Sequence, residues 1–287
     1  MKIIAIIQAR MGSSRLPGKV LIDIGGRPML EWVVERTRRA RTVDQVVVAT
    51  TLDPSDDPIF DFCKRKDYRV GRGSVHNVLD RYYQTAKHFQ ANVIVRITAD
   101  CPLIDPALID EAVKLLIPQT STLSLRSRLS APRFDFVANR LPPPWGRTYP
   151  IGLDIEVFTF DALTQAYKRG IAKHQREHVT PYLYEGTPVN QLQYKVSGSP
   201  FSSAMTPEGN HIALMHHTPD YGRLRWTVDT PTDLELVRAI VAHFPNRDDF
   251  TWHDVLALLK RKPELAQINA RVRHKTHLDV DDRSVNQ

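Results

Sequence analysis

The sequence predicts a doubly wound α/β fold, in which helices cover both faces of a mostly parallel sheet. Three runs of apolar, largely β-branched residues, at 2–8, 45–51 and 92–98, are separated by stretches with helical periodicity. Each run is almost continuously apolar, which is typical of strands buried on both faces. Strands that alternate with helices in this way favour a parallel sheet.

The helices between these strands are predicted from the spacing of apolar residues. Pro28 suits a helix start, because proline has no N–H to leave unpaired in the first turn. Ser74 suits the N-cap of an amphipathic helix, because its hydroxyl can accept a backbone N–H. The predicted helices span residues 28–41, 56–66, 74–89, 106–117, 161–169, 175–184 and 231–244.

The second half of the chain is less regular. Residues 123–150 are rich in Pro and Arg, with three consecutive prolines at 142–144, and we expect an extended insertion or lid there. The remaining predicted strands span 152–158, 191–196 and 223–228, and residues 197–220 resemble a loop. We expect a main domain over 1–245, and a C-terminal helical extension with a polar tail over 246–287.

Composition narrows the classes of function. The 287 residues are 42% hydrophobic, enough for one large domain or for one domain with a small appendage. The formal net charge of +7 fits either a solvated basic surface or a partner that carries phosphates. Because the basic residues are spread along the chain, small anionic ligands are favoured over nucleic acid.

The expected compartment is the cytoplasm. Cys63 and Cys101 form no CxxC pair and suggest no disulfide framework, which fits a reducing environment. The apolar N-terminal run is too short for a signal peptide, and no segment has the roughly 20 apolar residues that a membrane span needs.

The strongest local signal is the loop ARMGSSRLPGK, which follows the first strand. In an open α/β sheet this loop lies at the carboxyl edge, where ligands bind. Gly12 and Gly18 let backbone N–H groups approach an anion. Arg10, Arg15 and Lys19 supply about the positive charge that a triphosphate needs. The spacing of the glycines and the lysine in this loop does not match the P-loop motif of ATPases and GTPases, and the dinucleotide fingerprint GxGxxG is absent.

QARMGSSRLPGK resembles the opening signature of the cytidylyltransferases, which make CMP-sialic acid and CMP-KDO and include a spore-coat polysaccharide branch. The resemblance implies a GT-A-like, Rossmann-like nucleotidyltransferase domain, CTP as donor, a sugar-type acceptor, Mg²⁺ and, as one assembly, a homodimer. It implies catalytic roles for Arg10, Arg15 and Lys19. The nucleotide-binding residues that it implies are Ala9, Arg10, Gly12, Ser13, Arg15, Lys19, Arg72, Gly73, Ser74 and Thr98.

Two aspartates are candidate metal ligands. Asp100 follows the strand at 92–98, and Asp229 follows the predicted strand at 223–228, so both would lie at strand ends. Paired carboxylates there can hold Mg²⁺ between phosphate oxygens, although an Asp before Thr-Pro is also a good helix start. The segments DCPLIDP and VDTPTDL resemble the metal-binding segments of the family. This resemblance implies that Asp100 and Asp229 are the metal ligands.

Three further segments resemble the family. GRGSVHNVLDRY carries Arg72, Gly73 and Ser74, whose implied role is contact with the base or ribose. YPIGLDIE and REHVT imply an irregular acceptor subregion, although ordinary packing would explain them equally well. Residues two apart on a strand share a face, so Asp154 and Glu156 could reach one substrate. The implied acceptor-binding residues are Tyr149, Asp154, Glu156, Arg176 and His178.

The expected reaction is in-line attack of an acceptor hydroxyl on the α-phosphate of CTP, with release of pyrophosphate. Two enzymatic alternatives remain, a nucleotidyltransferase using another nucleoside triphosphate and a GT-A glycosyltransferase using a nucleotide-sugar. The second alternative lacks the DxD-like motif that such enzymes place near the metal. A non-catalytic nucleotide-binding protein is the third hypothesis, and the pair Asp100 and Asp229 argues against it.

Overall fold

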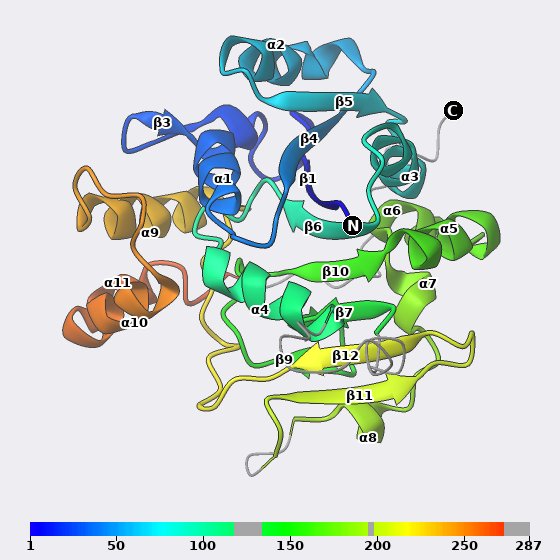
Figure 1. Ribbon diagram of the computed structural model, residues 1–287. Helices are drawn as coiled ribbons and strands as arrows, with labels where there is room; N and C mark the ends of the chain where they lie inside the picture. The colour runs from blue at the N-terminus through cyan, green and yellow to red at the C-terminus, as the bar shows by residue number, and fades with distance from the viewer. Residues whose placement is uncertain (118–133, 195–197, 273–287) are drawn as a thin grey trace.

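The computed structural model describes residues 1–117, 134–194 and 198–272. Within these residues an eight-stranded sheet has the order β11-β12-β7-β10-β6-β1-β4-β5 (Figure 1). Its strands are β1 (Ile3–Gln8), β4 (Gln45–Thr51), β5 (Arg69–Gly73), β6 (Val93–Thr98), β7 (Phe136–Ala138), β10 (Glu156–Thr159), β11 (Phe201–Met205) and β12 (His211–Met215).

The sheet is mostly parallel, as predicted. Strands β6, β1, β4 and β5 run in one direction, with Gln8 beside Ala49 on one neighbour and beside Thr98 on the other. Strand β10 lies antiparallel between β6 and β7, while β12 is again parallel to β7. The register brings the carboxyl ends of β1, β4 and β6 to one edge, where the phosphate loop begins.

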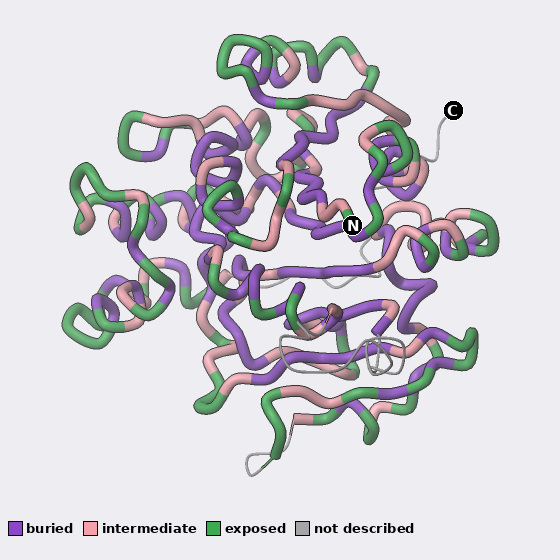
Figure 2. Tube along the Cα trace, viewed as in Figure 1, coloured by how far each residue is buried: buried purple, intermediate pink, exposed green. Residues whose placement is uncertain are grey.

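Helices cover both faces, so the doubly wound architecture is also confirmed. The helices are α1 (Met29–Arg38), α2 (Asp57–Arg65), α3 (Val78–His88), α4 (Pro106–Leu116), α5 (Phe160–Arg169), α6 (Lys173–His178), α7 (Pro181–Tyr184), α8 (Val189–Leu192), α9 (Pro231–Ala242), α10 (Trp252–Arg261) and α11 (Pro263–Gln267). One core contains Ala5 and Ile7 with helices α1, α2, α4, α9 and α10. The other contains Ile4 and Ile6 with α3, α5 and α7, and the strands between the two are buried (Figure 2).

The N-terminal half follows the sequence predictions closely, with two corrections. Strand β5 was not predicted, because its sequence RVGRG has one apolar side chain. It lies at the edge of the sheet, where a strand needs no apolar run. Ser74 is not the N-cap: α3 begins at Val78, and the Asn77 side chain accepts the N–H of Asp80 at 2.9 Å.

The strand predicted over 223–228 is wrong. One isolated bridge joins Ile151 to Arg225, and the segment crosses the carboxyl edge of the sheet instead of joining it. Its hydrogen bonds explain this path, since Trp226 N–H binds the carbonyl of Ile151 and Val228 N–H binds that of Asp100. The segment nevertheless delivers Asp229 to the edge.

Other corrections concern the second half. Within the loop predicted over 197–220, β11 and β12 form a hairpin, and 189–192 form α8 where a strand was predicted from 191. Residues 195–197 lie outside the described part. The helix predicted over 175–184 is two helices, since Val179 has a φ of 73° and ends α6. The strand predicted from 152 begins at Glu156.

The insertion predicted over 123–150 falls partly on residues 118–133, which the structure does not describe. Its remaining part is more regular than expected, because β7 joins the central sheet and a hairpin forms from β8 (Arg140–Leu141) and β9 (Gly146–Arg147). Helices α10 and α11 match the expected C-terminal helices, and Trp252 and Leu258 belong to the same core as the sheet. None of the helices in the described ranges is long and apolar enough to cross a membrane.

Candidate active site

Three adjoining cavities, of about 480, 230 and 150 Å³, open at the carboxyl edge of the sheet. The last residues of β1, β4 and β6, which are Gln8, Thr51 and Thr98, all contribute to their walls. Arg10 and Glu177 line all three cavities, so the three form one continuous cleft. This is the edge at which the sequence placed the ligand.

The phosphate loop forms a tight turn directly after the carboxyl end of β1. The N–H groups of Ser13 and Gly18 both donate to the carbonyl of Met11. Gly18 has a φ of 69°, in the left-handed region that favours glycine, and it ends the loop where the short 3₁₀ helix η1 (Lys19–Leu21) begins. The loop therefore presents Gly12, Ser13, Arg15 and Lys19 to the 230 Å³ cavity.

The two candidate metal ligands meet at a lysine. The Nζ of Lys19 lies 2.8 Å from Asp100 Oδ2, 2.8 Å from Asp229 Oδ1 and 2.9 Å from the carbonyl oxygen of Val228. Burial disfavours the charged ammonium, but the two carboxylates outweigh burial and raise the pKa of Lys19. The pKa of Asp100 shifts downward. Burial would raise it, but the charge of Lys19 and the hydrogen bonds from Lys19 and Thr98 hold it below the ordinary value.

Asp229 is tied to a second group of charges. It accepts from Arg15 at 2.9 Å and from Arg225 at 2.7 Å, and Arg225 also donates to the fully buried Asp233 at 2.9 Å. Asp233 belongs to the capping box of α9 with Thr230, so it also caps the first turn of that helix. Arg225 was not predicted; the spacing of Arg225, Asp229 and Asp233, four residues apart each time, was the available signal.

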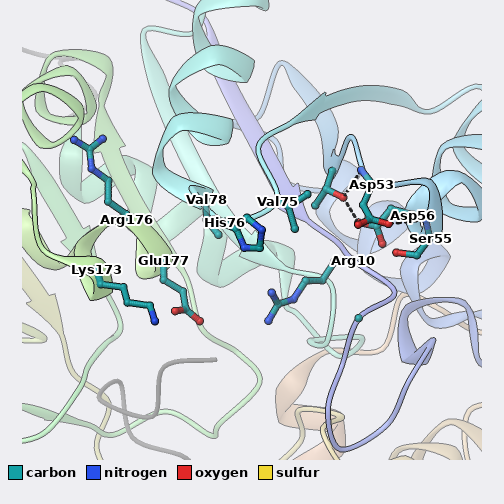
Figure 3. Close-up of a pocket in the computed structure, with 12 residues that line it drawn as sticks. Arg10, Asp53, Ser55, Asp56, Val75, His76, Val78, Lys173, Arg176 and Glu177 are labelled. Carbon is teal, nitrogen blue, oxygen red and sulfur yellow. Dashed lines mark hydrogen bonds between the residues drawn. The ribbon is translucent and has the colours of Figure 1, made fainter. Parts of the chain in front are cut away.

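Residues from three segments line the 480 Å³ cavity, and Figure 3 shows Asp53 and Ser55 on one side of Arg10 and Glu177 and Lys173 on the other. Asp53, Ser55 and His76 come from the loops after β4 and β5. Glu177 and Lys173 come from α6. None of these five was predicted as a site residue, although His76 lies in the family-like segment GRGSVHNVLDRY and Glu177 in REHVT. This cavity is the larger part of the cleft next to the phosphate loop.

The predicted nucleotide-binding residues divide into two groups. Ala9, Arg10, Gly12, Ser13, Arg15, Lys19 and Thr98 line the cleft. Arg72, Gly73 and Ser74 do not belong to the lining of the three cavities. The Arg72 side chain instead donates to the carbonyl of Thr51 at 2.7 Å and pairs with Asp57, which fixes the loop that carries Asp53.

The predicted acceptor-binding residues are not gathered in one place. His178 lines the 150 Å³ cavity, and Arg176 contributes to the lining of the 480 Å³ cavity. The guanidinium of Arg176 lies over the Tyr167 ring, 5.7 Å from its centroid. Tyr149 is buried against Trp252 and His217, and burial raises its pKa to about 12.

Asp154 and Glu156 do face a common partner. Arg140 lies 3.6 Å from Asp154 and 3.8 Å from Glu156. Asp154 also binds Arg147 at 2.5 Å, and the buried Glu156 pairs with Arg96 at 3.0 Å and accepts from Thr180 at 2.9 Å. Both carboxylates are therefore occupied by neighbouring side chains.

A cation-rich loop after the first strand of a mostly parallel sheet, facing two carboxylates at the same edge, defines a nucleotidyltransferase site. The family model described as cytidylyltransferase matches residues 4–217. The chain belongs to the cytidylyltransferase family.

Relatives and a solved structure agree with this assignment. The chain is 30% identical over 268 residues to the spore coat polysaccharide biosynthesis protein SpsF of Bacillus subtilis, covering 92% of this chain and 96% of that protein. It is 42% identical over 136 residues to the 3-deoxy-manno-octulosonate cytidylyltransferase of Geobacter sulfurreducens, covering 45% and 52% respectively. A cytidylyltransferase structure from Leptospira borgpetersenii aligns with a TM-score of 0.77 and 30% identity, over 96% of this chain and 100% of that one.

Proposed function

We propose that this enzyme transfers CMP from CTP to a hydroxyl group of a sugar or sugar acid, releasing pyrophosphate, for surface polysaccharide or glycan synthesis. The observation that carries the proposal is the convergence of the phosphate loop with Asp100 and Asp229 in one cavity. The names of the relatives support the acceptor class, because one acts in spore coat polysaccharide synthesis and one on 3-deoxy-manno-octulosonate.

The size and charge of the cavities support a division of the nucleotide between them. The 230 Å³ cavity contains Arg15, Lys19 and the loop backbone, which suit a triphosphate. The adjoining 480 Å³ cavity, with Asp53, Ser55 and His76, offers room and polar partners for a nucleoside. Arg10 lines both and would then contact the phosphate nearest the nucleoside.

The reaction needs no covalent enzyme intermediate. The acceptor oxygen forms a bond to the α-phosphorus while the bond to the β-phosphate oxygen breaks, and the acceptor proton passes to solvent or a nearby base. Negative charge builds on the leaving pyrophosphate, where Arg15 and Lys19 would stabilise it, while Arg10 would stabilise the charge on the α-phosphate. Glu177 lines all three cavities and is the carboxylate best placed to receive the acceptor proton.

Mg²⁺ fits the carboxylates of Asp100 and Asp229. Both approach one nitrogen cation at 2.8 Å, so both can contact a single positive centre. In the described ranges no cluster of three or more acidic, His or Cys side chains could hold a metal by itself. A two-carboxylate site suits Mg²⁺, which is usually completed by water and substrate phosphates. When bound, the metal would neutralise charge on the phosphates and lower the acceptor pKa.

The test is thermal unfolding of the purified protein with CTP, UTP, GTP and ATP, each with and without Mg²⁺. At saturation CTP should stabilise the fold by a few kcal/mol, as roughly 100-fold excess over Kd gives about 2.7 kcal/mol. Asp100→Ala should lose the Mg²⁺-dependent part. A larger shift with another nucleotide would assign a different donor, and no shift with any of them would contradict the proposal. Pyrophosphate release with acidic and neutral sugars then identifies the acceptor.

A further inference from the structure

The ammonium group of Lys19 has three N–H donors and three oxygen acceptors. Its three oxygen partners are Asp100 Oδ2, Asp229 Oδ1 and the Val228 carbonyl, all within 2.9 Å. The residue is 8% exposed, so water does not compete strongly for these bonds. In this conformation Lys19 stands between the two carboxylates that suit a metal ion.

The surrounding charges are balanced without a metal. Lys19, Arg15 and Arg225 are cationic, and they contact Asp100, Asp229 and Asp233. The formal charges of this group of six side chains cancel. A divalent cation added to it would leave an uncompensated charge of +2 in a partly buried place, which is unfavourable.

We propose that Lys19 closes the metal site of the nucleotide-free enzyme, and that a divalent cation occupies it only when a nucleoside triphosphate draws Lys19 away. This inference rests on the proposed function, because it requires a triphosphate in the cavity that Lys19 lines. The triphosphate supplies negative charge for both the lysine and the metal. Metal and nucleotide therefore bind in a coupled manner, with the affinity for each raised by the other.

The position of Lys19 favours such an exchange. Its neighbours Gly12, Ser13 and Arg15 line the same 230 Å³ cavity, so phosphate oxygens there would lie close to the ammonium group. A lysine carries its charge on a flexible four-carbon chain, so it can change acceptors without movement of the backbone. The backbone of Lys19 is fixed in η1, whose start is set by Gly18.

The experiment measures binding of Mn²⁺, as a paramagnetic substitute for Mg²⁺, to nucleotide-free protein by electron paramagnetic resonance. Lys19→Met removes the ammonium and retains the length of the side chain. It should bind Mn²⁺ at least about 10-fold more tightly than the wild type, because charge-assisted hydrogen bonds to two carboxylates no longer compete. Lys66→Met is the matched control, since Lys66 pairs with Glu31 at 2.9 Å outside the cleft, and it should bind like the wild type.

Two further variants locate the effect. Lys19→Gln, which is neutral but polar, should show the same direction of change and guards against poor folding of the methionine variant. Adding Asp100→Asn to Lys19→Met should abolish the gain. No gain in either Lys19 variant, or an equal gain in Lys66→Met, would overturn the inference.

A second titration separates this inference from the proposed function. With the wild type, CTP should raise the affinity for Mn²⁺ by about 10-fold or more, the range of typical coupling energies. If CTP does not bind the wild type at all, the proposed function fails, whereas tighter Mn²⁺ binding by Lys19→Met would still show that the lysine closes the site. If CTP binds but does not change Mn²⁺ binding, the coupling is wrong and the nucleotide site stands.

Discussion

Asp56 accepts a hydrogen bond at 2.6 Å from the backbone N–H of Met11, 45 residues earlier in the chain. Its other carboxylate oxygen accepts from the hydroxyl of Thr51 at the end of β4. This buried carboxylate therefore ties the phosphate loop to the neighbouring strand. The loop is positioned by a residue that lies outside its own motif.

Asp56→Ala is expected to loosen the phosphate loop. The partly buried N–H of Met11 would lose its acceptor, which costs about 1 kcal/mol of unfolding free energy. We expect CTP affinity to fall about 10-fold, measured by calorimetry, since part of the binding energy must then order the loop. Asp61→Ala is the control, because Asp61 lies at an exposed position of the neighbouring helix α2 and outside the cleft. Equal effects of the two variants would contradict a specific role for Asp56.

Arg225→Met should be strongly destabilising. Arg225 donates to Asp229 and to the fully buried Asp233, and its loss would leave a buried carboxylate without its cation. Removal of one partner of a buried ion pair typically costs about 3–5 kcal/mol. Urea unfolding measures the change. Arg223→Met, at an exposed position two residues earlier, should stay within about 0.5 kcal/mol of the wild type. A loss below about 1 kcal/mol in Arg225→Met would show that the pair is dispensable.

The stability contributed by Asp233 should depend on pH. Burial opposes its ionisation, but hydrogen bonds from Arg225 and Asn269 outweigh burial and lower its pKa. A folded pKa below the unfolded value of about 3.9 stabilises the fold above that pH, and the contribution disappears as the pH falls through the folded pKa. The difference in unfolding free energy between wild type and Asp233→Asn should therefore be greatest near pH 7 and shrink below about pH 4.

Urea unfolding at a series of pH values tests this dependence. The exposed Asp249 pairs with Arg247 on the surface, so Asp249→Asn should show little difference from the wild type at any pH. A difference between wild type and Asp233→Asn that stays constant from pH 7 to pH 3 would show that another interaction of Asp233 dominates.

Gly152→Ala should disturb the segment that delivers Asp229. Gly152 has a φ of 103°, and a Cβ there would lie 2.4 Å from the backbone nitrogen of Thr227. Gly146 is a matched control, because its φ is 100° but no atom lies within 4 Å of the Cβ position. Both alanine variants carry similar backbone strain, of about 1–3 kcal/mol. Gly152→Ala should lose additional stability and CTP binding, and similar losses in both would mean that strain alone matters.

Glu156→Gln distinguishes two roles for Glu156. The structure pairs this buried carboxylate with Arg96 at 3.0 Å, so its neutralisation should cost about 3–5 kcal/mol in thermal or urea unfolding. The family resemblance implies instead a contact with the acceptor. In that case the KM for the acceptor would rise, while the unfolding free energy and the KM for CTP stayed close to their wild-type values.

The sequence by itself determined the parts of this protein that depend on local patterns. Continuous runs of apolar, largely β-branched residues predicted β1, β4 and β6, because such runs are typical of strands buried on both faces. The loop motif predicted the cations of the cleft, since Arg10, Arg15 and Lys19 lie close to one another in the chain. The hairpin of β11 and β12 and the edge strand β5 escaped prediction, because short or polar strands are stabilised by their neighbours rather than by their own composition.

Only the tertiary structure decided which charges meet. Lys19 and Asp229 are 210 residues apart, and their contact follows from the packing of the 224–228 segment against the carboxyl edge of the sheet. The same holds for Asp56 beneath the phosphate loop and for Glu156 beside Arg96. These contacts depend on the relative placement of distant backbone segments, which hydrophobic packing fixes. No local sequence pattern predicts that placement.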